Sequence, residues 1–239
     1  MTYQILKNIT GIILAGGRSS RFGRDKGLFP FRGKPLVEHA IDILQPIIND
    51  ICISTNQPET YAYLGLPMIG DIHQGCGPLG GMHAALLAMP SVETRFIASQ
   101  TEYQGDRAMG RQGDGATGRG GDEATGRPGD IVEAMAVISC DTPLVPPELY
   151  GMLLENLGEF DAVVPVHGDY LEATCAIYTT NCLPAFEEAI LAKRFKIIDA
   201  LKKVNTLFLN IEQASFYHPG VFHNINTIDD TRTIDPIGP

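Results

Sequence analysis

The feature that most constrains this chain is the stretch Leu14–Lys26, which reads LAGGRSSRFGRDK. It follows the apolar run Ile9–Leu14, which predicts a buried strand. Gly16 and Gly17 then interrupt the strand and allow the backbone to approach a ligand closely. Because hydroxyl groups and several cations follow at once, the stretch predicts a loop that binds a polyphosphate.

The stretch does not match two familiar phosphate-binding patterns. It lacks the Gly-x-x-x-x-Gly-Lys-Ser/Thr of a P-loop and the Gly-x-Gly-x-x-Gly of dinucleotide-binding proteins. Phe29-Pro30 and Gly33-Lys34-Pro35 keep the next helix from starting much before Pro35. We therefore expect a long basic loop that wraps phosphates, and the alternative is a flexible basic surface loop.

Composition sets limits on the class of protein. The chain has 239 residues, of which 44% are hydrophobic, and this fits one globular domain over residues 1–239. A net charge of −10 argues against nucleic-acid binding and favours a small anionic ligand at the basic stretch. Five cysteines without a Cys-x-x-Cys pair indicate neither a disulfide framework nor a zinc site.

Targeting signals are not evident in the sequence. The first residues, MTYQILKNIT, contain no apolar segment of the signal-peptide kind, and no apolar run has the length of a membrane helix. We expect a cytoplasmic protein with no membrane partner.

Strand and helix patterns alternate along the chain and predict an α/β fold with a mostly parallel sheet flanked by helices. Strands are expected at 9–14, 50–55, 66–69, 134–140, 161–166, 174–178 and 206–211, and helices at 35–47, 79–89, 146–157, 182–193 and 196–204. In such sheets, ligands lie beyond the carboxyl ends of the strands. The glycine stretch, Asp71 and Asp141 each follow a strand and are therefore expected at one crevice.

The segment 105–130 does not fit this alternation. It repeats an octapeptide, GDRAMGRQ, GDGATGRG and GDEATGRP, with almost no apolar residues. Such a segment cannot bury a face, so we expect a disordered insertion in a surface loop. A partner-binding role for it is the alternative.

Lys26 and Arg21 are the candidate catalytic residues. A lysine at the end of the glycine stretch can neutralise phosphate charge in the transition state. Arg21 can form a forked contact with phosphate oxygens. The alternative for both is a solvated surface cation.

Asp141 is the candidate metal ligand. It ends the most apolar predicted strand, where a carboxylate needs a cation nearby. Mg²⁺ bound with a triphosphate is the expected partner, because this ion prefers one or two carboxylates together with phosphate oxygens. A helix N-cap is the alternative.

Further polar residues complete the candidate site. Asp71 can accept from ribose hydroxyls or from the N1/N2 edge of guanine, and Asn224 and Asn226 can bind a pterin or a metal-bound oxygen. Turn chemistry is the alternative for all three. The histidines, His73, His83, His167 and His223 among them, lack metal-type spacing and are expected to be surface or core residues.

Taken together, LAGGRSSRFGRDKG, GKPLVEH, the Asp71 site, GCGPLGGMHAAL, SCDTPLVPP and FHNINT resemble the molybdenum cofactor guanylyltransferase family, which acts in molybdopterin-guanine dinucleotide biosynthesis. The resemblance implies a Rossmann-like nucleotidyltransferase domain and Mg²⁺-dependent transfer of GMP from GTP to molybdopterin or molybdenum cofactor, with release of pyrophosphate. It also allows for protein partners that take over the finished cofactor.

The resemblance assigns roles to residues as well. It implies nucleotide contacts for Leu14, Ala15, Gly16, Lys26, Asp71 and Asp141, metal binding for Asp141 and acceptor contacts for Asn224 and Asn226. The sequence departs from the family pattern at Ser54, Ala173 and Ile228 and at its short tail. A cytidylyltransferase acting on molybdopterin or on a sugar or polyol phosphate, a non-catalytic adaptor and a degenerate homologue are the alternatives.

Overall fold

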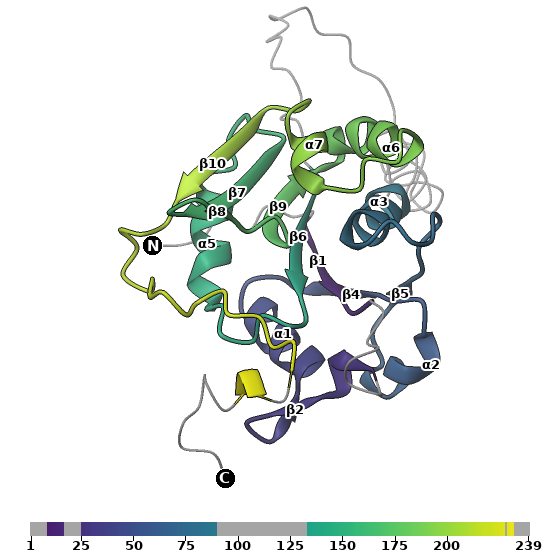
Figure 1. The fold of residues 1–239 in the computed structure, drawn as a ribbon, viewed down its shortest axis with the longest axis vertical. Coiled ribbons are helices and arrows are strands. Elements are labelled where there is room, and N and C mark those ends of the chain that lie inside the picture. Colours follow the sequence, from purple (N-terminus) through teal and green to yellow (C-terminus); the bar gives the residue numbers. More distant parts are fainter. Residues whose placement is uncertain (1–8, 17–24, 90–132, 228, 232–239) are drawn as a thin grey trace, which may run out of the picture.

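The computed structural model describes residues 9–16, 25–89, 133–227 and 229–231 (Figure 1). The octapeptide segment 105–130 lies outside these ranges, as do Arg21 and Ile228. The expectations about those residues therefore stay predictions, as does the assignment of 1–239 to a single domain.

A sheet of eight strands forms the centre of the molecule. Seven strands lie side by side in the order β10-β7-β9-β6-β1-β4-β5, and β8 pairs with β7. Their bounds are β1 Ile9–Leu14, β4 Asp50–Ser54, β5 Met68–Ile69, β6 Ala134–Ser139, β7 Ala162–His167, β8 Tyr170–Leu171, β9 Cys175–Thr179 and β10 Thr206–Asn210.

Most neighbouring strands run parallel, which confirms the predicted sheet type. β1 is parallel to both β6 and β4, β4 to β5, and β10 to β7. The exceptions are β9, which is antiparallel to both β6 and β7, and the short β8. Because β9 is antiparallel to both of its neighbours, β7 runs in the same direction as β6. The carboxyl ends of β6 and β7 therefore lie at the same edge of the sheet.

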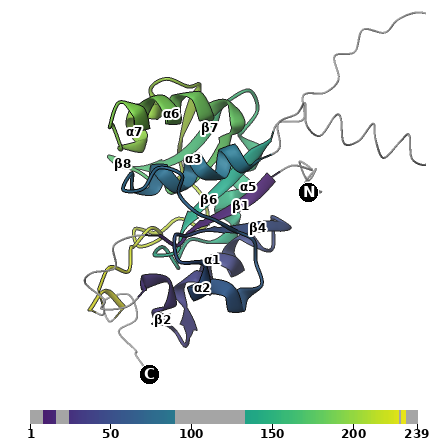
Figure 2. The same cartoon turned by 90° about the vertical axis from the view of Figure 1, so that its right-hand side faces the viewer.

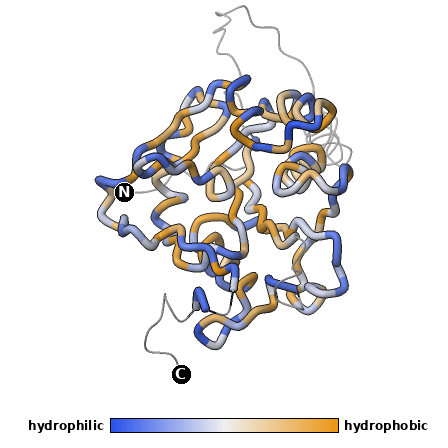
Figure 3. The backbone as a smooth tube through the Cα atoms, viewed as in Figure 1, coloured by the Kyte–Doolittle hydropathy of each residue, from blue (hydrophilic) through white to orange (hydrophobic). Residues whose placement is uncertain are grey.

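Helices cover both faces of the sheet, as continuously apolar strands require. Among the described residues, helices α1 Leu36–Leu44 and α5 Pro147–Glu155 pack on one face, together with Tyr61 of the short helix α2 Pro58–Tyr61. Three pack on the other, α3 Pro78–Ala88, α6 Leu183–Leu191 and α7 Ile197–Leu201. Figure 2 shows α6 and α7 above the sheet and α1 below it, and Figure 3 shows hydrophobic residues along the central strands.

Alternation along the strands divides the core into two layers. In β1, Ile13 belongs to the α1/α5 layer, whereas Ile12 and Leu14 belong to the α3/α6 layer. This follows from the two-residue repeat of a strand. Both layers consist of apolar side chains, and the polar residues with candidate roles follow the ends of the strands.

The sequence did not predict some of the short elements. Strands β2 Pro30–Phe31 and β3 Lys34–Pro35 form a hairpin, in which Arg32 and Gly33 both adopt positive φ angles, of 49° and 78°. The short helix α2 Pro58–Tyr61 follows β4 and is extended by a 3₁₀ turn, Ala62–Leu64. Within the described ranges, every helix is too short or too polar to span a membrane.

Candidate functional site

The candidate site lies where four parallel strands end in one row. Leu14 of β1 pairs in register with Ser54 of β4 and with Ser139 of β6, and Ser54 pairs with Ile69 of β5. The chain continues past this row in each strand, and two backbone bonds extend the ladder: Ala15 N donates to Ser54 O at 3.0 Å, and Cys140 N donates to Leu14 O at 3.2 Å. The carboxyl edge of the sheet is thus held rigidly at this point.

The residues with candidate roles stand two positions beyond that row. They are Gly16 after β1, Asn56 after β4, Asp71 after β5 and Asp141 after β6. The expectation of one shared edge of the sheet is therefore confirmed for Gly16, Asp71 and Asp141, and residues 17–24 of the glycine stretch lie outside the described ranges.

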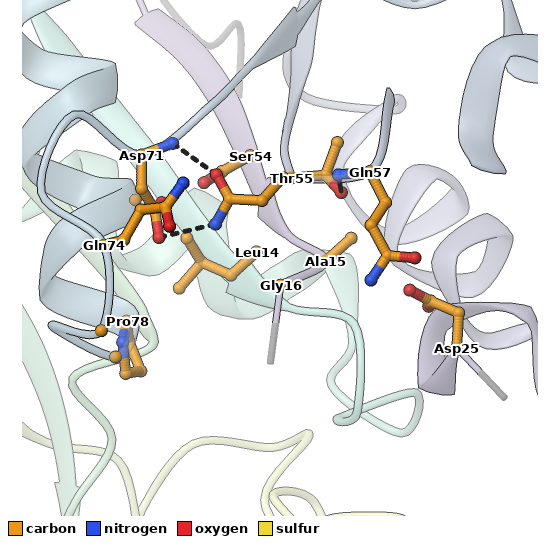
Figure 4. A pocket seen from close by; sticks show the side chains of 14 residues that line it. Leu14, Ala15, Gly16, Asp25, Ser54, Thr55, Gln57, Asp71, Gln74 and Pro78 are labelled. Carbon is orange, nitrogen blue, oxygen red and sulfur yellow. Dashed lines mark hydrogen bonds between the residues drawn. The ribbon is translucent and has the colours of Figure 1, made fainter. Parts of the chain in front are cut away.

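A pocket of about 740 Å³ opens beside the ends of β1, β4 and β5 (Figure 4). Leu14, Ala15 and Gly16 lie at its centre, Asp71 and Gln74 on one side, and Gln57 and Asp25 on the other. The rest of its lining is Ser54, Thr55, Asn56, Gly75, Gly77, Pro78 and Gly81. Its volume lies in the range of pockets that bind small molecules.

Asp71 is fixed by a reciprocal pair of hydrogen bonds. Asn56 Nδ2 donates to Asp71 Oδ2 at 2.9 Å, and the Asp71 backbone N–H donates to Asn56 Oδ1 at 2.8 Å. The amide therefore orients the carboxylate while its second oxygen, Oδ1, keeps acceptor capacity. An oriented carboxylate at a pocket wall can accept from paired N–H or O–H donors of a ligand, as the sequence predicts for Asp71.

Glycines bring the first turn of α3 close to the ends of the strands. Gly77 precedes the helix with φ 62° and ψ −151°, a conformation that only glycine adopts readily. At Gly81, a Cβ atom would lie 2.3 Å from Ser54 Oγ and 3.4 Å from Asp71 Oδ1. The missing side chain therefore lets the helix pack on β4 and leaves room at the pocket wall.

Lys26, Asp141 and Asn226 form a second group at the same edge. Lys26 Nζ donates to Asp141 Oδ2 at 2.6 Å and to Asn226 Oδ1 at 2.7 Å. The side chains of Lys26 and Asp141 are only 18% and 21% exposed. Ser139 Oγ donates to the other carboxylate oxygen, Asp141 Oδ1, at 2.5 Å. The cation that a carboxylate at this position requires is thus supplied by the lysine.

The segment that carries Asn226 is anchored to this edge from far along the sequence. Ile225 is fully buried against Phe29, Phe31 and Leu36, and its backbone N–H donates to Asp141 O at 2.9 Å. This fixes Asn226 beside Lys26. Asn224 lies exposed two residues earlier, and its acceptor role stays a prediction.

Asp230 holds the far side of this segment. Its Oδ2 accepts from the backbone N–H groups of Asn226 and Thr227, at 2.6 and 2.7 Å. Burial works to raise its pKa, but these donors outweigh it and bring the pKa below the ordinary value. The carboxylate form therefore stabilises the segment at neutral pH.

The alternatives for the acidic residues can be compared with this geometry. The residue before α5 is Pro146, and no side chain caps that helix, so Asp141 is not its N-cap. Asp71 is bonded to Asn56 rather than serving only a turn before Gly75. Both carboxylates face other site residues instead of the backbone of a local turn.

The donor set can accommodate a hard cation. Asp141 Oδ2 and Asn226 Oδ1 already converge on one positive charge, the Lys26 ammonium, and Mg²⁺ prefers oxygen ligands of this kind. Among the described residues, no three His, Cys, Asp or Glu side chains gather as an all-protein metal site. This arrangement suits an ion that shares its coordination with phosphate oxygens.

The cysteines lie in the core, and the histidines have structural surroundings. All five cysteines are free and buried. His83 is buried in α3, where burial and then the neighbouring His73 lower its pKa. His167 bonds to Glu172 at 2.9 Å and stacks on Phe222.

Sequence reasoning missed Asn56, Asp25 and Ser139. The sequence pattern draws attention only to Ser54 in this segment, yet Asn56, two residues later, is the residue that orients Asp71. The sequence does contain a signal, because Asn56 follows the end of its buried strand by two residues, as Asp71 and Asp141 follow theirs. Asp25 has no predicted role, because it lies between Arg24 and Lys26 in a segment whose pattern is dominated by cations.

Comparison with known proteins adds an independent finding. The sequence model of the family described as "MobA-like NTP transferase domain" matches residues 11–204. A protein of Pelotomaculum thermopropionicum named "Probable molybdenum cofactor guanylyltransferase" is 28% identical over 223 residues, which cover 92% of this chain and 89% of that protein. The "Molybdenum cofactor guanylyltransferase" of Yersinia pestis is 54% identical over 82 residues, 33% of this chain and 42% of its own.

Solved structures show the same fold. "Molybdopterin-guanine dinucleotide biosynthesis protein A" from Archaeoglobus fulgidus matches with a TM-score of 0.65 and 25% identity, over 95% of this chain and 97% of that one. A 4-diphosphocytidyl-2C-methyl-D-erythritol synthase from Anaerococcus prevotii matches with a TM-score of 0.58 and 14% identity, over 97% and 98%, and this likeness concerns the fold alone.

Proposed function

The chain belongs to the MobA-like NTP transferase family, and from this premise we propose that it transfers GMP from GTP to molybdopterin or its molybdenum form and releases pyrophosphate. The observation that carries the proposal is one edge of the sheet that bears both a pocket with an oriented carboxylate, Asp71, and the Lys26–Asp141–Asn226 group. Relatives named as guanylyltransferases span most of the chain.

The pocket would bind the nucleoside half of GTP. The free acceptor oxygen of Asp71 suits the N1/N2 edge of guanine, and Asn56 keeps it pointed at the ligand. Leu14, Ala15 and Gly16 would lie along the nucleotide at the centre of the pocket. In contrast, cytosine presents an acceptor, N3, beside its amino group and has no ring N–H next to an amino donor, which is why a guanylyltransferase is preferred to a cytidylyltransferase.

The reaction would take place next to this pocket. A terminal phosphate oxygen of the acceptor attacks the α-phosphorus of GTP, the bond from that phosphorus to the bridging oxygen breaks, and pyrophosphate leaves. Lys26 would neutralise charge on the phosphates, and the rigid strand ends would keep the reactants in line. Such a reaction needs little covalent participation by the protein.

Mg²⁺ is proposed as the metal. Asp141 would hold it, with the amide oxygen of Asn226 in reach of the same position. When bound, the ion would supply Lewis-acid stabilisation of the triphosphate. Lys26, which bridges these two oxygens, would contact the phosphates beside the ion. Handover of the product to a protein partner stays a prediction.

The test is nucleotide discrimination followed by turnover. Purified protein with Mg²⁺ is titrated with GTP, CTP, ATP or UTP in a calorimeter, and pyrophosphate release is then measured with molybdopterin as acceptor. We expect tight binding of GTP alone and release that depends on both acceptor and Mg²⁺. Preference for CTP would transfer the proposal to the cytidylyltransferase alternative, and failure to bind any nucleotide would point to a degenerate homologue.

A further inference from the structure

Tyr61 is a fully buried tyrosine at the end of α2, four residues after Gln57 of the pocket lining, and it contacts residues at the edge of the pocket. Its ring packs in the same core layer as Ile13 and Ile53. Its hydroxyl donates to Asp25 Oδ1 and lies 3.4 Å from the Ala15 carbonyl oxygen. The hydroxyl therefore touches the residue after β1 and the residue before Lys26 at once.

Asp25 passes this contact on to the backbone around Lys26. The same oxygen, Oδ1, also accepts from the Gly27 N–H at 2.8 Å, and Asp25 caps the 3₁₀ turn Lys26–Leu28. One carboxylate oxygen of Asp25 thus accepts hydrogen bonds from both the Gly27 N–H, which follows Lys26, and the Tyr61 hydroxyl. The position of the Lys26 Cα is set from both of its neighbours.

Gly27 shows how tightly this contact is packed. A Cβ atom at this residue would lie 2.3 Å from the Tyr61 hydroxyl oxygen and 3.1 Å from two ring carbons. Because these ring atoms are held in the core, they cannot give way as a surface side chain would. The sequence Asp25-Lys26-Gly27 is therefore matched to the tyrosine beneath it.

The phenol is held in its donor form. Burial, followed by the hydrogen bond to Asp25, raises the pKa of Tyr61 well above its ordinary value. The hydroxyl accordingly stays protonated at any pH at which the protein works, and the bond to Asp25 does not switch with pH.

We propose that Tyr61 is a positioning residue for Lys26: its hydroxyl holds Asp25 and, through Asp25, the backbone at Gly27, so that the ammonium reaches Asp141 and Asn226. The inference rests on the proposed function, since Lys26 is there the residue that acts on phosphates. Tyr61 itself contacts no reacting group.

The test removes the hydroxyl alone. In Tyr61→Phe, kcat with GTP should fall about tenfold, as expected when one buried hydrogen bond to a charged group is lost. The dissociation constant for GTP should change by a smaller factor than kcat, because Asn56 and Asp71 are untouched and only the Ala15 and Asp25 side of the pocket loses a contact. Tyr150→Phe is the matched control: Tyr150 is also fully buried and donates to a backbone carbonyl, Val137 O, at 2.7 Å, but it lies away from Lys26. Its kcat should stay at the wild-type value.

Coupling to Lys26 separates positioning from general packing. In a Lys26→Ala background, adding Tyr61→Phe should lower kcat by less than about twofold, because nothing remains to be positioned. In an Asp71→Asn background, the same change should still cost about tenfold. An equal loss in both backgrounds would overturn the proposal.

Hydrogen exchange provides a readout that does not depend on activity. The Gly27 amide should exchange faster in Tyr61→Phe than in the wild type or in Tyr150→Phe, since its acceptor is no longer held. If the wild type turns over no nucleotide, the proposed function fails while this arm still tests the contact. Unchanged Gly27 exchange would refute the role of Tyr61. Should Tyr61→Phe not fold, Asp25→Ala removes the bonds to Tyr61 and to the Gly27 N–H together, and only its coupling is then read: its loss of kcat must disappear in the Lys26→Ala background, and a loss that persists there would overturn the proposal.

Discussion

Asp141→Asn gives the sharpest test of the candidate site, because the structure separates its effect on stability from its effect on chemistry. The Lys26–Asp141 pair is 2.6 Å long and about one-fifth exposed on each side. It thus lies between a surface pair, worth up to about 1 kcal/mol, and a buried pair, which costs about 3–5 kcal/mol to break. With an isosteric amide in place, we expect a loss of about 1–2 kcal/mol, or roughly 2–8 °C in Tm for a chain of this length.

The expected loss of turnover is much larger. Removing the carboxylate that would hold Mg²⁺ withdraws several kcal/mol of transition-state stabilisation, so kcat should fall about a hundredfold or more. Differential scanning calorimetry gives the first quantity and pyrophosphate release at saturating GTP and Mg²⁺ gives the second. Both must be measured on the same preparation.

The control is a charge pair outside the site. Asp42→Asn removes the partner of Lys34 in an ion pair whose two side chains, Asp42 and Lys34, are 57% and 34% exposed. The change should lower the free energy of unfolding by less than about 1 kcal/mol and leave kcat unchanged. Turnover of Asp141→Asn within a few-fold of wild type would remove Asp141 from the chemistry. A collapse of Tm far beyond the expected range would show that the aspartate is structural instead.

Three further predictions concern the pocket and its surroundings. Gly81→Ala places a Cβ atom 2.3 Å from Ser54 Oγ and should lower both Tm and GTP affinity, and Ser54→Ala in the same chain should restore much of both in thermal-shift and calorimetric titrations. Asp71→Asn should reduce the preference for GTP over ATP at least about tenfold in competitive binding, because an acceptor for guanine donors is lost; unchanged preference would exclude Asp71 from base recognition. Burial, followed by the nearby Asp141, raises the pKa of Cys140 to about 12 from 9.0. The folded chain therefore keeps a proton that the unfolded chain loses, so the free energy of unfolding should fall as pH rises above 9.0. Cys140 should account for on the order of 1 kcal/mol of that fall at about pH 10, which is measured as the difference between the wild type and Cys140→Ala in urea titrations.

The long elements could be predicted from sequence because their apolar periodicity is strong. The expected strand at 9–14 is β1 itself, and the expected strand at 134–140 differs from β6 by one residue. Periodicity does not encode direction, so the reversal of β9 within the sheet could not be foreseen. The β2–β3 hairpin was missed because two-residue strands are too short to show any period.

Candidate site residues could be predicted where a single residue stands out in the sequence. They could not be predicted where two residues distant in sequence act as a pair. An aspartate after a buried strand is conspicuous, and Asp71 and Asp141 were found in this way. The Asn56–Asp71 bond joins residues 15 apart, and Tyr61–Asp25 joins residues 36 apart. Such partners are brought together only by the pairing of strands, which a pattern along the chain does not contain.

The bond from Lys26 to Asn226 spans 200 positions of the chain, and this separation bears on how the protein is made. A ribosome makes the strands of the pocket and Asp141 well before it makes Asn226, so a nascent chain can assemble the pocket with Lys26 and Asp141 already paired. The last part of the site arrives only when Ile225 reaches its place against Phe29 and Phe31. Synthesis order would thus keep a nascent chain from completing the group around Lys26 until the segment with Ile225 and Asn226 has been made.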